Sequence, residues 1–358
     1  MGHEQFAVHE IEMCLPFRCV DAGDQPGAAV AAEFAHAWPA YRRWYLHEGE
    51  SERRSYTESR HALTRWMPEL VHDFDTLVDA VGGQDLEARF LSHWCPPPLV
   101  SACSMVMTSF PEPLLIRNYD YPPLLSDSLA LRTHWSGRSI IGMSDCGWGL
   151  MDGVSDHGIA VAVAFGGRRN IGEGFGIGLV VRYVLQVATS TAHAIELLSR
   201  IPVQMSYNLA VIDSSGDHRV VHLAPDHRPI VTRAASAANR QGHTEWPEHA
   251  EYCNTLEREE WMAVLTSTPG VGAARLKYEF LQPPLHRSML ESTWGTLYTA
   301  AYSPSVGSLS LLWSDDEWHL SVYGDHSERR PRTVRTLVPE PSVVRSAMPH
   351  DRRVPMVI

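Results

Sequence analysis

The order of patterns along the chain predicts an α+β protein built from antiparallel sheets. Short runs typical of β-strands dominate residues 101–165, helical patterns follow at 176–200, and strand patterns return at 206–234 and 295–323. Strands and helices therefore come in blocks, whereas a parallel sheet would need a regular alternation of the two. With 358 residues, 44% of them hydrophobic, the chain is long enough to bury a substantial core.

The first hundred residues are expected to be mainly helical. Residues 28–45 are rich in alanine with aromatic side chains at helical spacing, and residues 60–81 repeat apolar side chains every three or four positions. Three consecutive prolines follow within residues 94–99. Prolines lack the backbone donor that a helix or a central strand needs, so this segment is predicted to be a linker.

The remaining elements are predicted from apolar runs separated by Gly, Asp and Ser turns. Pro202 ends the second of the helices that follow the first block of strands. We expect strands at 99–110, 114–121, 129–135, 139–143, 147–154, 158–165, 206–213, 218–224, 229–234, 295–302, 308–313 and 317–323, and helices at 176–188, 191–200 and 245–263.

The charge and the cysteines limit the function classes. The formal net charge of −12 argues against nucleic acid or an anionic membrane as the main partner. The chain contains no run of about 18 apolar residues that could span a bilayer, and its first residues do not resemble a signal peptide. Six cysteines without a paired framework are typical of reduced thiols, so we expect a cytoplasmic protein.

Cys103 is the candidate nucleophile. It has the small neighbours Ala102 and Ser104, follows the proline-rich linker, and lies in the first of two strand-like runs that a short turn joins. The second run brings Arg117 and Asp120 close to it. A guanidinium beside a thiol favours the reactive thiolate, whereas the other five cysteines are interpreted as small packed residues. From the residues alone, Arg117 and Asp120 could equally form a structural ion pair.

An ordered set of motifs resembles the penicillin acyltransferase family of linear amide C–N hydrolases, which belongs to the N-terminal nucleophile hydrolases. The motifs run over most of the chain from about residue 28 onward. They are Cys103-Ser, Ile116-Arg-Asn-Tyr-Asp120, Met151-Asp-Gly-Val-Ser-Asp-His-Gly-Ile-Ala-Val-Ala162, Thr191-Ala-His-Ala-Ile-Glu-Leu-Leu198, Tyr207-Asn-Leu-Ala-Val-Ile-Asp-Ser-Ser-Gly216 and Ala237-Ala-Asn239.

The resemblance implies a four-layer αββα sandwich of two antiparallel sheets flanked by helices. It also implies self-cleavage between Ala102 and Cys103, which divides the chain into a helical pro-region, residues 1–102, and a catalytic region, residues 103–358, within one globular unit. The freed α-amine of Cys103 would then act as the base for its own thiol.

The resemblance also assigns roles to individual residues. Asp120 would bind the new amino terminus, Arg117 would favour the thiolate, and Asn239 would stabilise the oxyanion, an effect worth roughly 3 kcal/mol per donor. Substrate contacts are expected from Phe165, Tyr119 and Arg168, the last as a partner for a substrate carboxylate. The expected partners are a small-molecule amide or acyl donor and an amine acceptor, and the fragments should remain associated. No cofactor or metal ion is expected.

Three positions depart from the family pattern. Ala102 stands where the family often has glycine, Ser155 where it commonly has asparagine, and Arg240 where it often has histidine. Asn239 could therefore be a simple turn residue.

The resemblance leaves three functions open. The first is a cysteine amidase that hydrolyses a linear amide through an acyl-enzyme. The second is an acyltransferase that uses the same site to move an acyl group from a thioester such as acyl-CoA to an amine. The third is a non-catalytic ligand-binding protein on the same fold.

Overall fold

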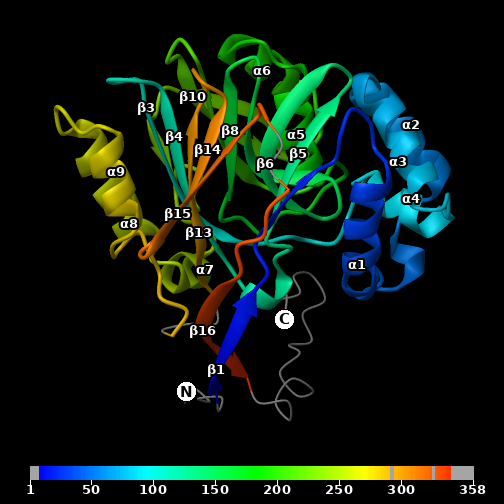
Figure 1. The fold of residues 1–358 in the computed structure, drawn as a ribbon, viewed down its shortest axis with the longest axis horizontal. Helices are drawn as coiled ribbons and strands as arrows, with labels where there is room; N and C mark the ends of the chain where they lie inside the picture. The colour runs from blue at the N-terminus through cyan, green and yellow to red at the C-terminus, as the bar shows by residue number, and fades with distance from the viewer. Residues whose placement is uncertain (1–7, 291–293, 325–326, 340–358) are drawn as a thin grey trace.

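A computed structural model describes residues 8–290, 294–324 and 327–339. They form a mixed α+β structure with two main sheets, as the sequence predicts (Figure 1). The eight-stranded sheet has the order β11-β10-β9-β8-β7-β6-β5-β2, and the six-stranded sheet has the order β12-β3-β4-β13-β14-β15. Every pairing within them is antiparallel except that of β2 with β5.

The strands of the eight-stranded sheet are β2 (Arg18–Asp21), β5 (Leu129–Trp135), β6 (Arg138–Asp145), β7 (Gly149–Ser155), β8 (Ile159–Phe165), β9 (Tyr207–Asp213), β10 (His218–Ala224) and β11 (His227–Thr232). The six-stranded sheet contains β3 (Ala102–Thr108), β4 (Leu114–Tyr121), β12 (Ser236–Ala237), β13 (Gly295–Ser303), β14 (Ser308–Trp313) and β15 (Asp316–Ser321). A separate ribbon pairs β1 (Val8–Leu15) with β16 (Arg332–Pro339).

The two main sheets pack face to face, with β3 and β4 against β8 and β9. The outer face of the larger sheet is covered by α5 (Ile177–Val187) and α6 (Thr191–Leu198). Two further helices, α8 (Thr255–Ser267) and α9 (Ala273–Phe280), pack on β3, β4 and β12. Strands β7 and β8 are buried along their whole length because they are covered on both faces, so they read as continuous apolar runs.

Four helices at one end of the molecule come from the first hundred residues (Figure 1). They are α1 (Ala28–Tyr45), α2 (Tyr56–Trp66), α3 (Val71–Ala80) and α4 (Asp85–Leu91). The helical prediction is wrong for residues 8–21, which form β1 and β2. Their partners are β16 and β5, more than a hundred residues away, so the pairing is not visible in a local pattern.

Two predicted helices are each divided in the structure. The pattern at 60–81 is broken at Pro68, which cannot donate the helical hydrogen bond. The pattern at 245–263 becomes α7 (Pro247–Tyr252) and α8, which meet at Asn254 in the left-handed conformation, φ 49°. The sequence also failed to predict α4, α9 and the two-residue strand β12.

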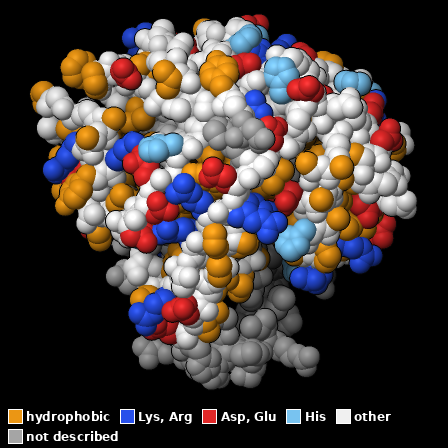
Figure 2. Space-filling model, in the orientation of Figure 1, with side chains coloured by type: hydrophobic (Ala, Val, Ile, Leu, Met, Phe, Trp, Pro, Cys, Tyr) orange, Lys and Arg blue, Asp and Glu red, His pale blue; other side chains and the backbone are white. Residues whose placement is uncertain are grey.

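Acidic and basic side chains are intermixed on the face drawn in Figure 2, with small groups of hydrophobic side chains between them. Within the described parts of the chain, every helix is too short or too polar to cross a bilayer.

Candidate active site

The β3–β4 hairpin brings the predicted nucleophile and its partners together. Its register places Ala102 opposite Asp120, Cys103 opposite Tyr119, and Met105 opposite Arg117. Both strands are almost entirely buried, because β4 lies between β3 and β13 inside the smaller sheet. The candidate cleavage bond therefore lies in the interior of the protein, at the start of a strand.

The Cys103 sulfur is fully buried and faces a cation. Arg117 Nη2 donates to Cys103 Sγ at 3.2 Å, and the Ser101 hydroxyl lies 3.5 Å from the same sulfur. The Arg117 guanidinium is thus within hydrogen-bond distance of the sulfur.

A buried ion pair holds Arg117 in this position. Its Nη1 donates to the Asp152 carboxylate and to the carbonyl oxygen of Met151, at 3.1 Å for the latter. The hydroxyls of Tyr298 and Tyr302 also donate to Asp152, Tyr298 at 3.0 Å. Burial opposes the charge of Arg117, but Cys103 and Asp152 outweigh it and raise the pKa of the guanidinium well above its usual value.

Arg117 is therefore not the ion-pair partner of Asp120, as one reading of the sequence allowed, and Asp152 takes that place. The sequence placed Asp152 in a family-like motif but gave it no role. A lone aspartate on a strand carries no signal that its side chain will meet an arginine from the other sheet.

Asp120 has one satisfied and one free oxygen. Oδ1 accepts from the Thr296 hydroxyl at 2.7 Å, whereas Oδ2 is buried and accepts no hydrogen bond from any described residue. The nearest cation is Arg258, whose Nη1 lies 4.0 Å from Oδ2. Burial raises the pKa of Asp120, and Arg258 is the first of several groups that oppose this shift. A buried carboxylate oxygen that accepts no hydrogen bond is costly.

Asn239 bridges the residues on both sides of the candidate cleavage bond. Its Oδ1 accepts from the Cys103 backbone N–H at 3.0 Å and from Arg258 Nη2 at 2.8 Å. Its Nδ2 donates to the carbonyl oxygens of Ser101, at 3.2 Å, and Phe165, at 3.0 Å. An asparagine with four such contacts is not a simple turn residue.

Gly167 allows the Asn239 segment to approach the end of β8. It has φ +72°, and a Cβ at this position would overlap the Asn239 carbonyl oxygen. Only glycine adopts this positive φ without strain and also leaves room for the Asn239 carbonyl oxygen.

Arg258 belongs to the site, and the sequence did not reveal it. Its Nη1 donates to the Cys103 carbonyl oxygen at 2.6 Å and to the Ser104 hydroxyl at 2.8 Å, and the side chain is fully buried. Its helix, α8, is rich in acidic residues, and nothing in that pattern distinguishes this arginine from a surface one. Only the packing of α8 on β3 places it at the nucleophile.

The three predicted substrate contacts have different surroundings. Phe165 is buried, and its carbonyl oxygen binds Asn239. Tyr119 lies under Arg117, with the guanidinium carbon 4.5 Å from the ring centroid. Arg168 binds two carboxylates, both oxygens of Asp226 and one of Glu245. Arg168 is therefore already committed to ion pairs, and we leave it out of the site that we propose below.

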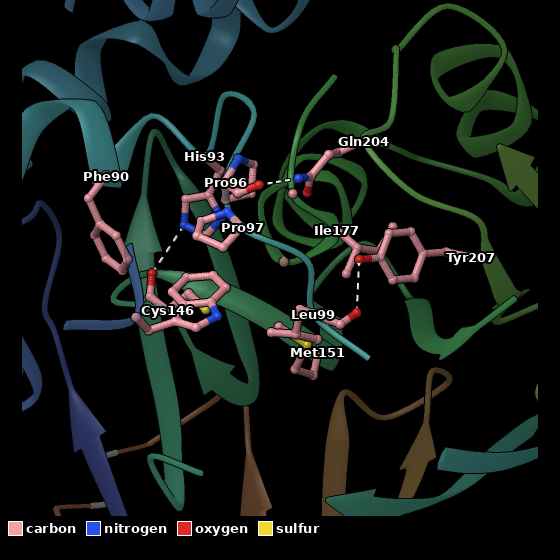
Figure 3. A pocket seen from close by; sticks show the side chains of 13 residues that line it. Phe90, His93, Pro96, Pro97, Leu99, Cys146, Met151, Ile177, Gln204 and Tyr207 are labelled. Carbon is pink, nitrogen blue, oxygen red and sulfur yellow. Dashed lines mark hydrogen bonds between the residues drawn. The ribbon is translucent and has the colours of Figure 1, made fainter. Parts of the chain in front are cut away.

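A small cavity lies between the proline-rich linker and strands of the larger sheet (Figure 3). Its volume of about 20 Å³ has room for roughly one water molecule. Most of its lining is apolar: Trp44, Phe90, His93, Pro96, Pro97, Leu99, Cys146, Met151, Gly176, Ile177, Gly178, Gln204 and Tyr207. Two hydrogen bonds tie the linker across it, from the Gln204 side chain to the Pro96 carbonyl and from the Tyr207 hydroxyl to the Leu99 carbonyl.

Cys103 does not line this cavity, but two of the lining residues are linked to the candidate site. Leu99 lies four residues before Cys103 in the chain, and the Met151 carbonyl binds Arg117. The Cys103 side chain itself is fully buried in the uncleaved chain.

Comparison with known proteins identifies the family. Residues 108–318, more than half of the chain, match the model described as "AAT: Acyl-coenzyme A:6-aminopenicillanic acid acyl-transferase". The chain belongs to this family of amide hydrolases and acyltransferases. The matched segment includes Arg117, Asp120, Asn239 and Arg258 but begins after Cys103. A comparison with curated protein sequences found no match.

Several solved structures are similar to this one at low sequence identity. A variant of conjugated bile acid hydrolase from Clostridium perfringens shares 10% identity over 64% of this chain and 96% of its own, with a TM-score of 0.46. Penicillin V acylase from Agrobacterium tumefaciens shares 11% identity over 64% of this chain and 90% of its own, with a TM-score of 0.44. The N-acylethanolamine-hydrolyzing acid amidase orthologue of Caenorhabditis elegans shares 13% identity over 57% of this chain and 93% of its own, with a TM-score of 0.31. The family assignment rests on the family model alone.

Proposed function

We propose that this protein is a cysteine N-terminal nucleophile amidase that cleaves itself before Cys103 and then hydrolyses a linear amide. The observation that carries the proposal is the free Oδ2 of Asp120. It is buried opposite Ala102 in the hairpin register, and it accepts no hydrogen bond from any residue that the structure describes, Arg258 being 4.0 Å away. We propose that the ammonium group released at Cys103 becomes the donor to this oxygen.

The first reaction is an acyl shift within the chain. Cys103 Sγ attacks the Ala102 carbonyl carbon, the Ala102–Cys103 C–N bond breaks, and the thiol proton passes to the departing amine. Water then hydrolyses the thioester, which leaves a carboxylate on Ala102 and restores the thiol. Asn239 and Arg258 hold the Cys103 peptide N–H and C=O during this step.

The second reaction uses the α-amine and the sulfur of the same residue. The amine, with an ordinary pKa near about 8, takes the thiol proton and passes it to the leaving amine of the substrate. The acyl group stays on the sulfur until water attacks. We propose that Asn239 Nδ2, freed from Ser101 once the chain is cut, donates to the oxyanion when the acyl-enzyme forms and again when water attacks it.

The fragments should remain together after cleavage. Strand β2 is part of the larger sheet and β1 pairs with β16, so the N-terminal region shares backbone hydrogen bonds with the rest of the fold. We assign the arrangement of α5 and α6, two sheets, and α8 and α9 to the four-layer αββα class, with residues 1–102 as pro-region and 103–358 as catalytic region. We propose that movement of the cut linker connects the apolar cavity that the linker lines to Cys103 and so admits the acyl group.

Acyl transfer is the second candidate, because the matching family is described by transfer from acyl-CoA. In that case an amine rather than water takes the acyl group from the Cys103 sulfur. The two candidates need the same residues and differ in the acyl donor, an amide or a thioester, and in the acceptor, water or an amine.

The experiment presents the purified protein with N-acyl p-nitroanilides of increasing acyl length, and separately with acyl-CoA and an added primary amine. Release of p-nitroaniline, with an acyl adduct on the peptide that begins at Cys103, supports the amidase. Amide formed only when the amine is added supports transfer. Failure of every donor to modify Cys103, together with its inertness to iodoacetamide, contradicts both and favours the non-catalytic alternative.

A further inference from the structure

His249 is a buried histidine next to the candidate cleavage site that the mechanism above does not use. It lies in α7, packed between aromatic rings, with centroids 5.1 Å from Phe165 and 5.1 Å from Trp246. Only 6% of the residue is exposed. A buried imidazole has two nitrogens to satisfy, and here only one of them is satisfied.

The satisfied nitrogen faces a second thiol. His249 Nε2 lies 3.4 Å from Cys253 Sγ. Burial raises the pKa of Cys253 to about 11, so this sulfur carries its proton at neutral pH and is able to donate it to Nε2. In that arrangement the neutral imidazole carries its own proton on Nδ1, because the partner of one ring nitrogen determines the tautomer.

The proton-bearing nitrogen is the unsatisfied one. Nδ1 of His249 is buried and has no hydrogen-bond partner among the residues that the structure describes. Burial lowers the pKa of His249 to about 4 and Arg258 lowers it further, whereas an interaction with the Ser101 backbone raises it. Of these groups only the Ser101 backbone acts on the ring by hydrogen bonding, and the Ser101 carbonyl already accepts from Asn239.

We propose that His249 is a positioning residue for the self-cleavage, and that its Nδ1–H hydrogen-bonds the Ser101 carbonyl oxygen as the next peptide is attacked. This proposal rests on the proposed function. Two donors, from Asn239 and His249, then fix Ser101 while the Ala102 carbonyl carbon becomes tetrahedral. Hydrogen bonds at reacting sites are often long before the reaction and tighten during it.

The consequence is kinetic. The carbonyl carbon of Ala102 must stay aligned with the Cys103 sulfur, and a misplacement of about 1 Å can slow a reaction about 100-fold. His249 touches neither the sulfur nor the attacked carbon in this account, so its loss slows the cleavage without abolishing it.

Two substitutions separate this role from simple packing. In His249→Asn, the side-chain amide nitrogen can occupy the place of Nδ1 and keep a donor there. In His249→Gln, the amide group reaches the place of Nε2 and leaves the Nδ1 position without a donor. Both variants lose the imidazole ring and its aromatic contacts, so a purely structural role predicts the same effect for both.

The test follows the full chain during cell-free synthesis and measures, by denaturing gel and mass spectrometry, how fast the fragment beginning at Cys103 appears. We expect His249→Gln to cleave at least tenfold more slowly than wild type and His249→Asn to stay within about threefold of it, since only Asn keeps the Nδ1 donor. Thermal unfolding of both variants on a Cys103→Ala background shows whether they fold equally well.

Equal rates for the two variants, or faster cleavage by the Gln variant, would overturn the role of His249 while leaving the proposed function intact. Wild-type chain that never cleaves would overturn both.

Discussion

Three fully buried groups make up the centre of the candidate site: the sulfur of Cys103, the guanidinium of Arg117 and Oδ2 of Asp120. Arg117 is held by Asp152 and two tyrosines from β13, so its charge is fixed before any substrate arrives. Preorganised charge of this kind avoids the cost of reorientation during the reaction.

The Arg117–Asp152 pair should also matter for stability. Asp152→Ala leaves Arg117 as an uncompensated buried cation, and we expect the free energy of unfolding to fall by about 3–5 kcal/mol in urea denaturation. The control is Asp315→Ala, which breaks the surface pair with Arg332. The side chain of Asp315 is 70% exposed, and the expected loss there is about 0–1 kcal/mol. Similar losses for the two variants would contradict the prediction that the buried ion pair contributes more to the free energy of unfolding than the surface pair.

Asp120→Asn tests the proposed binding of the new amino terminus. The amide keeps the shape of the carboxylate but removes its charge, and a charge-assisted hydrogen bond is about twice as strong as a neutral one. We expect amidase activity to fall about tenfold to 100-fold, which corresponds to about 1.4–2.8 kcal/mol. The comparison is Thr296→Val, which removes the hydrogen bond to Oδ1 together with the one that the Thr296 hydroxyl accepts from the Arg287 N–H. A larger loss in the Thr296 variant would argue against the assigned role of Oδ2.

At the level of elements, the strand pattern predicted much of the fold. Strands β4, β5, β10 and β14 have the bounds that the sequence predicts, because each is a compact apolar run between turn residues. Strands β1, β2 and β16 were missed, since each pairs with a partner far away in sequence. The same limit applies to the site. The β3–β4 hairpin could be predicted because it is local, whereas Arg258 and Asp152 reach it only through packing between elements.

The turn after β8 provides the test at this scale. Gly167→Ala should push the Asn239 carbonyl away and displace its side chain from Cys103, which slows self-cleavage at least tenfold. Gly242→Ala is the matched control. It has a similar φ of +75°, but a Cβ there meets nothing within 4 Å. Cleavage rates from a time course should therefore fall only for Gly167→Ala, and equal effects would show that backbone strain, not the position of Asn239, limits the reaction.

On the scale of the whole molecule, a buried acidic network connects the N-terminal helices to both sheets. Tyr41 from α1 donates to Asp127 at 2.6 Å, and Tyr119 from β4 donates to Asp145 of β6 at 2.8 Å. The backbone N–H of Asp127 also donates to Asp145 at 2.9 Å. Burial raises the pKa of Asp127 to about 8 and that of Asp145 to about 6. The charge of Asp145 raises the pKa of Asp127 further.

This network predicts a pH dependence of stability. Because the folded pKa values lie above those of the unfolded chain, the folded protein holds more protons, and the stabilisation is lost as pH rises from about 4 through the folded values. Asp127→Asn removes one such group. Its free energy of unfolding relative to wild type should therefore increase from pH 5 to pH 8, by up to about 1.4 kcal/mol per pH unit. Parallel curves in urea denaturation at several pH values would contradict this.

The most direct test is the intact mass of freshly purified protein under denaturing conditions. The account predicts two fragments, one ending at Ala102 and one beginning at Cys103, that elute together in gel filtration without denaturant, and a single 40.0 kDa chain for Cys103→Ala. A wild-type protein that stays at 40.0 kDa, or a break at any other bond, would contradict the claim that this sulfur becomes the amino-terminal nucleophile.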